Sequence, residues 1–212
     1  MPAGGKTESA AAYLPQSLTL GRLREAAAGC KGCHLWERAT QTVFGEGRAS
    51  ATLMLVGEQP GDQEDTAGKP FVGPAGKLLD RALEEAGIDR DAAYVTNVVK
   101  HFKWQARGKR RIHAKPSWSE MAACRPWLEA EIAAIEPSVL VCLGATAAQA
   151  LLGRDFRVSR QRGELVDSPL APYVTATIHP SAILRQRDEE SRHAELEAFV
   201  ADLRKVAGLL DS

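Results

Sequence analysis

Short runs of apolar residues alternate along this chain with stretches in which apolar residues recur every three or four positions. The runs are rich in valine, isoleucine, leucine and threonine, as buried β-strands are, and they cover residues 53–56, 94–99, 139–143 and 175–178. The periodic stretches predict helices over residues 76–86, 118–135, 145–152 and 191–209. Alternating strands and helices predict an α/β fold, with a mainly parallel central sheet flanked by helices on both faces.

Composition sets the limits of the predicted domain. Residues 1–17 are rich in alanine, glycine and serine and are expected to form a flexible N-terminal tail, which leaves residues 18–212 for one domain. A chain of 212 residues with 44% hydrophobic and 25% charged content is long enough to bury one sizeable core. Inside the helical stretch 118–135, Pro126 should kink the helix or divide it in two.

The sequence carries no sign of a membrane or export segment. No apolar run approaches the roughly 18 residues needed to span a bilayer, and residues 1–17 lack a basic start followed by an apolar stretch. We therefore expect a cytoplasmic protein with no membrane association, and we expect it to be a monomer.

Charge points to nucleic acid only in one place. The chain has 27 basic and 27 acidic residues, so its net charge gives no support for a nucleic-acid partner. Residues 100–115, however, contain seven lysines or arginines and no acidic residue, with Phe102 and Trp104 interleaved. This pattern is typical of a loop that contacts phosphates. On charge alone, a solvated basic loop explains it equally well.

The four cysteines indicate a metal or cluster site. Cys30 and Cys33 form a CxxC pair, and Cys124 and Cys142 follow far along the chain. Reduced cytosolic chains seldom use disulfides, and four thiolates suit either structural zinc or an iron-sulfur cluster. Spacing does not separate these two. The alternative is that Cys124 and Cys142 are small buried apolar residues.

Ligand sites in parallel α/β sheets gather where the strands end at their carboxyl edges. Two glycine-rich segments lie in such positions, GEQPGD at residues 57–62 and GKPFVGPAG at residues 68–76. Glycine-rich turns bring backbone amides and a helix start close to a ligand. By themselves these segments predict only a pocket for an anion or a base.

Together with Thr96-Asn97 and His179-Pro180-Ser181, these motifs resemble the family 4 uracil-DNA glycosylases. The resemblance extends from about Cys30 to Arg185 and includes all four cysteines. Two features depart from the ordinary family pattern. The first motif reads GEQPG where alanine or glycine is usual in the middle, and residues 107–113 form an extra basic loop. The GKRRIH of residues 108–113 resembles the hallmark of the X-type branch, UdgX.

The resemblance implies the following chemistry. The substrate is uracil-containing DNA, with the single-stranded form favoured, and a [4Fe-4S] cluster is held by Cys30, Cys33, Cys124 and Cys142. Members of the X-type branch excise uracil and stay attached to the abasic sugar through the loop histidine. Catalysis is therefore assigned to His113 as the nucleophile that attacks C1′, to Glu58 as its orienting carboxylate, and to His179 as a donor to uracil O2.

The remaining residues of the motifs are expected to bind the substrate. Asn97 is expected to read the uracil edge, and Phe71 to stack on the flipped base. Gly57, Gln59 and Asp62 are expected to shape the pocket. Arg111, with Lys109 and Arg110, is expected to contact phosphates or to hold the loop closed. Ser181 begins a segment that resembles the family's DNA-wedging loop, with Leu184 as the intercalating side chain.

Two other functions are compatible with the sequence. One is an ordinary family 4 glycosylase that releases its product and turns over, with His113 as a bystander. The other is a non-catalytic module in which the cysteines hold zinc and the basic loop binds nucleic acid.

Overall fold

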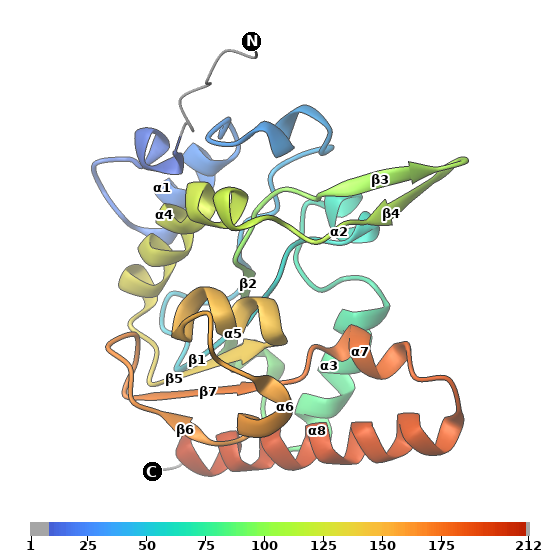
Figure 1. Cartoon of the computed structure of the whole chain (residues 1–212). Coiled ribbons are helices and arrows are strands. Elements are labelled where there is room, and N and C mark those ends of the chain that lie inside the picture. Colours follow the sequence, from blue (N-terminus) through green and yellow to red (C-terminus); the bar gives the residue numbers. More distant parts are fainter. Residues whose placement is uncertain (1–8, 211–212) are drawn as a thin grey trace.

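The computed structural model describes residues 9–210, which fold around a central five-stranded sheet (Figure 1). The strand order is β2-β1-β5-β7-β6, and every neighbouring pair is parallel except β6 and β7. The mainly parallel sheet predicted from the sequence is confirmed. The strands are β1 (Leu53–Gly57), β2 (Ala93–Asn97), β5 (Val139–Leu143), β6 (Leu165–Val166) and β7 (Tyr173–Thr177).

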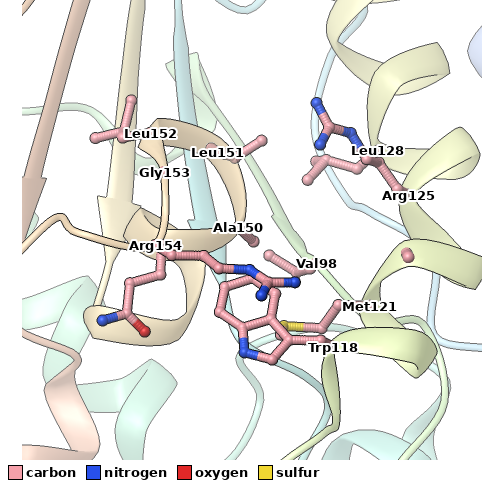
Figure 2. Close-up of a pocket in the computed structure, with 12 residues that line it drawn as sticks. Val98, Trp118, Met121, Arg125, Leu128, Ala150, Leu151, Leu152, Gly153 and Arg154 are labelled. Atoms are coloured by element: carbon pink, nitrogen blue, oxygen red, sulfur yellow. The ribbon is translucent and has the colours of Figure 1, made fainter.

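Helices cover both faces of this sheet, as predicted. Side chains alternate along a strand, so Met54 and Val56 of β1 pack with α1 (Leu20–Ala27), α4 (Trp118–Ile135) and α5 (Ala145–Leu152). Leu53 and Leu55 pack on the opposite face with α3 (Pro74–Glu85), α7 (Pro180–Leu184) and α8 (Glu189–Leu210). A groove lies between α4 and α5 (Figure 2). The shorter helices are η1 (Ala10–Tyr13), η2 (His34–Glu37), α2 (Asp62–Ala67), η3 (Arg90–Ala92) and α6 (Val158–Gln161).

Of the two outcomes expected at Pro126, a kink or a division of the helix, the division is wrong, because α4 runs without interruption from Trp118 to Ile135. Proline removes the hydrogen bond to the carbonyl four residues earlier. That carbonyl belongs to Ala122, whose exposed position lets water take the place of the missing donor.

The basic segment predicted as a loop is a β-hairpin. It pairs β3 (Trp104–Arg107) with β4 (Arg110–His113) and extends from the body of the protein beside α2 (Figure 1). Gly108 makes the turn with φ +60°, a conformation that glycine adopts without steric cost. Trp104 lies opposite His113 in the register, so His113 is at the base of the hairpin, next to the sheet.

Part of the predicted flexible tail is folded. Residues 1–8 lie outside the described residues, but Ala10–Tyr13 forms η1, and Ala10 is buried. The backbone of Ala10 packs on Gly32, where a Cβ atom would come within 2.6 Å of the Ala10 nitrogen. Glycine between the two CxxC cysteines therefore lets the N-terminal segment dock. Among the helices of residues 9–210, none is long and apolar enough to cross a membrane.

Candidate active site

The carboxyl ends of β1 and β2 bring two sequence-predicted residues side by side. Gly57 is the register partner of Asn97. A Cβ atom at Gly57 would overlap the Asn97 Oδ1 and lie 2.7 Å from Phe71 Cζ, so only glycine lets these groups converge. Asn97 is 3% exposed, and its carboxamide has no hydrogen-bond partner among residues 9–210. Both polar atoms of this amide are therefore left for a ligand.

The Phe71 ring forms one wall beside this amide. Its backbone has φ +56°, which is rare for a residue with a side chain. Gly76 makes the turn possible, because a Cβ atom there would collide with the Phe71 carbonyl. The ring stacks on His179 with centroids 6.0 Å apart and an interplanar angle of 26°. Strain of this kind is characteristic of functional positions.

The protonation of His179 is fixed by its neighbours. It precedes α7, and its Nδ1 accepts the Ser181 backbone N–H at 3.1 Å and the Ser181 hydroxyl at 2.8 Å. Burial lowers the pKa of His179 to about 4, against an opposing effect of Glu58. The ring is therefore neutral at pH 7, with its proton on Nε2. Ser181, which was expected to bind substrate, serves in this structure to orient the histidine.

Glu58 and His113 meet as the sequence analysis anticipated. The Glu58 Oε1 lies 3.2 Å from the His113 Nε2, and the Thr146 hydroxyl at the start of α5 also hydrogen-bonds the carboxylate. Burial raises the pKa of Glu58, but the hydrogen bonds from His113 and Thr146 outweigh it and lower the pKa overall. The carboxylate is thus ionised and can accept a proton. Both Glu58 and His113 are near enough to His179 to affect its pKa.

Gln59 was expected to shape the pocket, but its side chain is directed at the hairpin instead. Its Nε2 donates to the carbonyls of Lys103 and Ala114, both at 3.1 Å, and its Oε1 accepts the Lys103 N–H at 3.1 Å. Lys103 and Ala114 flank the hairpin on its two sides. Gln59 therefore clamps the base of the hairpin, next to His113.

Arg111 holds the hairpin against α2. Its Nε lies 2.5 Å from an Asp62 oxygen and its Nη1 lies 2.6 Å from an Asp65 oxygen, and Asp65 is fully buried. Arg111 was expected either to contact phosphates or to hold the loop closed. The structure favours the second role. Asp62 likewise serves as its partner. Lys109 and Arg110 lie exposed at the turn.

Three of the four cysteines are close together. Cys30 and Cys33 lie in the loop after α1 and Cys124 lies on α4, near enough for each of the first two to affect the pKa of the third. Cys30 Sγ accepts hydrogen bonds from Trp127 Nε1 at 3.2 Å and the Gly32 N–H at 3.5 Å. N–H groups directed at cysteine sulfurs suit an iron-sulfur cluster, whose potential they tune. Burial raises the pKa of Cys124 to about 12, so its ionisation requires a bound cation.

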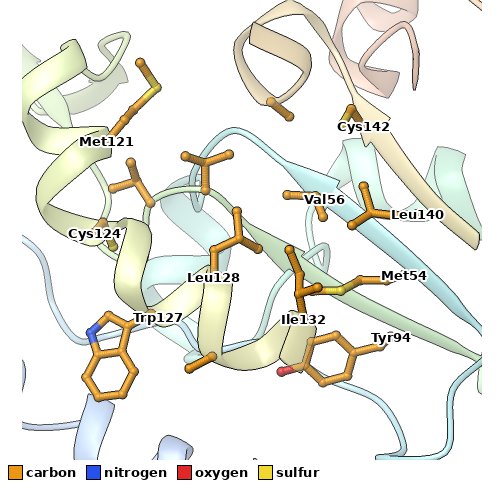
Figure 3. Close-up of a cluster of buried hydrophobic side chains, with 14 of the residues drawn as sticks. Met54, Val56, Tyr94, Met121, Cys124, Trp127, Leu128, Ile132, Leu140 and Cys142 are labelled. Atoms are coloured by element: carbon orange, nitrogen blue, oxygen red, sulfur yellow. The ribbon is translucent and has the colours of Figure 1, made fainter. Parts of the chain in front are cut away.

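Cys142 lies apart from these three. It occupies the middle of the sheet on β5, between Val56 and Ala176, and its pKa is raised to about 12 by burial alone. Figure 3 shows Cys124 and Cys142 on opposite sides of the buried cluster, with Leu128 and Val56 between them. Within residues 9–210, no group of three or more histidine, cysteine, aspartate or glutamate side chains is arranged to hold a metal ion.

The sequence analysis missed a buried lysine that links the cysteines to the pocket. The Lys100 N–H donates to Cys124 Sγ at 3.2 Å, and its Nζ donates to the Asn97 carbonyl at 2.7 Å. Its charge is paired with the equally buried Glu131, which also accepts from the Tyr94 and Thr96 hydroxyls. The position of this lysine directly after an apolar strand could have indicated that it is buried. Its charge was instead counted with the basic loop.

The fold and the site define an α/β protein with converging amide, imidazole and carboxylate groups at the carboxyl edge of its sheet. The family model of the uracil DNA glycosylase superfamily matches residues 44–204. The chain belongs to this superfamily.

Curated relatives agree with this assignment. The chain is 40% identical over 169 residues to a protein of Thermotoga maritima named type-4 uracil-DNA glycosylase, a match that covers 79% of this chain and 84% of the relative. It is 35% identical over 187 residues to a protein of the same name from Archaeoglobus fulgidus, covering 85% and 87%. A type-5 uracil-DNA glycosylase of Thermus thermophilus is 30% identical over 198 residues, covering 84% and 85%.

Proposed function

We propose that this protein excises uracil from DNA, preferably single-stranded DNA, and then remains bonded through His113 to C1′ of the abasic sugar. Relatives named type-4 uracil-DNA glycosylase support the excision step. The observation that carries the bonding step is the Glu58–His113 contact of 3.2 Å beside the Asn97 and His179 pocket.

Recognition uses the pocket walls. A stacked base is out of reach, so the uridine is taken flipped or from a single strand. The flipped base stacks on Phe71, which offsets part of the unstacking cost. Uracil presents O4 as an acceptor and N3–H as a donor, and the Asn97 carboxamide complements both. Cytosine reverses the pattern at this edge and is rejected.

Breaking the C1′–N1 bond sends its electron pair into the uracil ring, where negative charge develops on O2. The neutral His179 ring has its Nδ1 occupied by the Ser181 N–H, so its Nε2–H is the free donor. A donor directed at that oxygen stabilises the transition state more than the ground state.

His113 then supplies the partner for the cationic sugar. A lone pair of the neutral imidazole forms the new nitrogen–carbon bond, and the ring proton passes to the ionised Glu58. This carboxylate has a vacant site for the proton, because its lowered pKa keeps it ionised before the reaction. An imidazole nitrogen is a poor leaving group, so the adduct persists and the protein acts once.

A [4Fe-4S] cluster is part of the proposal, with Cys30, Cys33 and Cys124 as ligands that lie near one another and Cys142 as the fourth ligand expected from the resemblance. Such a cluster would cross-link the loop after α1 to α4, and it need not take part in excision. The position of Cys142 in the sheet does not support its expected place in the ligand set.

A denaturing gel after mixing with uracil-containing single-stranded DNA tests the function. Wild type is expected to give a slow-migrating species that survives boiling and detergent, and His113→Ala none. His193→Ala is the matched control, because His193 also lies 3.2 Å from a glutamate but on the exposed α8. Glu58→Gln should slow the adduct by about 10²-fold, since the amide cannot accept the proton.

Other outcomes would favour the alternatives. Repeated release of free uracil without an adduct supports an ordinary turnover glycosylase. No uracil release, together with a colourless anaerobic preparation containing stoichiometric zinc, supports a non-catalytic nucleic-acid module.

A further inference from the structure

The groove between α4 and α5 lies outside the residues assigned to excision. It has a volume of about 510 Å³ (Figure 2). Its walls combine apolar side chains with Trp118 and Arg125 of α4, Gln149 of α5 and Arg154, which follows α5. Among the residues that the structure describes, no acidic residue lines it. Its electrostatic character therefore favours an anionic occupant with an apolar portion.

Trp118 and Arg154 form the most distinctive feature of this groove. The Arg154 guanidinium lies over the Trp118 ring, 4.4 Å from its centre, although the tryptophan is 40% exposed. Part of the tryptophan ring is therefore open to a ligand. Stacked aromatic and guanidinium planes are the surface on which proteins bind unpaired bases.

The two arginines of the groove differ in whether their charge is free to bind an anion. Arg125 is paired with Glu129 at 2.7 Å on the same helix. Arg154 has no acidic partner among the residues that the structure describes. Its guanidinium can therefore contact a phosphate while it stacks on Trp118.

The groove and the uracil pocket are lined by neighbouring residues of the same elements. Val98 in its wall directly follows Asn97, and Gln149 lies one turn of α5 beyond Thr146, the partner of Glu58. This adjacency puts the groove within reach of a nucleotide that neighbours a uridine bound against Asn97. An unpaired base next to the excision site is present only in single-stranded DNA.

We propose that the Trp118–Arg154 groove binds a nucleotide flanking the uridine in single-stranded DNA, with its base stacked at Trp118 and its phosphate against Arg154. This inference rests on the proposed function, because it takes DNA as the substrate. It also gives a physical basis for the preference for single strands.

Equilibrium binding of a uracil-free single-stranded oligonucleotide tests the site without any excision. Trp118→Ala should raise the Kd about tenfold, as expected for the loss of one stacked base. Trp118→Phe should restore most of the affinity. The matched control is Trp36→Ala, because Trp36 is 37% exposed and lies under Lys31 at 4.6 Å, yet is outside the groove. Its Kd should stay within about twofold of wild type.

Salt dependence tests the phosphate contact separately. Arg154→Ala should reduce the slope of log K against log salt by about 0.7, the value for one phosphate on a single strand. An unchanged slope would remove Arg154 from the proposal. Circular dichroism should show that both variants are folded, since Trp118 and Arg154 are exposed.

A length series separates this inference from the proposed function. Trp118→Ala should match wild type on substrates whose uridine is the terminal nucleotide on the side of the groove. It should fall behind wild type, by about tenfold at limiting substrate, once a nucleotide is added on that side. If wild type releases no uracil from any substrate, the proposed function fails. If wild type excises uracil but Trp118→Ala binds uracil-free DNA as tightly as wild type, or Trp36→Ala loses as much, only the groove proposal fails.

Discussion

His179 illustrates how a single backbone amide can decide which ring nitrogen of a candidate catalytic histidine carries the proton. Its Nδ1 accepts the Ser181 N–H. A proton on Nδ1 would place two N–H donors opposite each other. Burial is the main cause that lowers its pKa to about 4, from an ordinary value of 6.5. The tautomer of His179 follows from a local contact, because Ser181 lies only two positions later at the start of α7. The lowered pKa is not encoded locally, because it follows from the packing around the ring.

This lowered pKa predicts a pH dependence of stability. The unfolded chain takes up a proton on His179 below pH 6.5, whereas the folded protein resists protonation until about pH 4. Stability is therefore present above pH 6.5 and is lost as the pH falls towards 4, by about 2–3 kcal/mol. His179→Gln, which does not titrate, should show a smaller loss in urea unfolding at pH 7 and pH 4.5. An equal loss in both proteins would contradict the assignment.

At the scale of elements, the hairpin depends on Gln59 at its base. Gln59→Ala leaves the carbonyls of Lys103 and Ala114 without their common donor and frees the strand that carries His113. We expect the adduct to form at least about tenfold more slowly, because a small misplacement of a nucleophile is costly. Quenched time courses on denaturing gels measure this rate.

Two controls accompany the Gln59→Ala experiment: the uracil affinity of that variant, and a second variant, Gln59→Glu. Uracil affinity should stay near that of wild type in Gln59→Ala, because Gln59 does not face the pocket. Gln59→Glu should be at least as slow as the alanine variant, since it directs a carboxylate at two carbonyl oxygens. A large rise in KM with unchanged adduct formation would instead place Gln59 on the base.

The same hairpin shows where sequence reasoning stops. The four main strands are continuous apolar runs buried on both faces, so their composition identifies them. The segment around Gly108 has basic residues on both faces, so no alternation reveals its strands. It is held by Gln59, Asp62 and Asp65, which are distant in sequence. Such long-range contacts leave no local pattern.

At the scale of the whole molecule, the candidate cluster and the uracil pocket share a framework. Cys30 and Cys33 lie on the loop after α1, and Cys124 lies near them on α4. The buried Lys100 extends this framework, because it contacts both Cys124 and the Asn97 carbonyl. A cluster between these segments would therefore hold the amide that we propose reads uracil, without entering the reaction.

The structure separates Cys142 from the other three cysteines of the motif, so their roles can be tested one by one. Cys124 and Cys142 are equally hidden, at 3% and 0% exposure, so alanine at either position removes a similar amount of packing. Cys142→Ala should keep the visible absorbance and iron content, and lose about 1 kcal/mol of stability. Cys124→Ala should lose the iron and much more stability, because metal binding contributes directly to folding. Iron analysis and thermal unfolding of the two purified variants measure the difference. Equal loss of iron in both would restore Cys142 to the ligand set and require β5 to move towards the CxxC loop when the cluster binds.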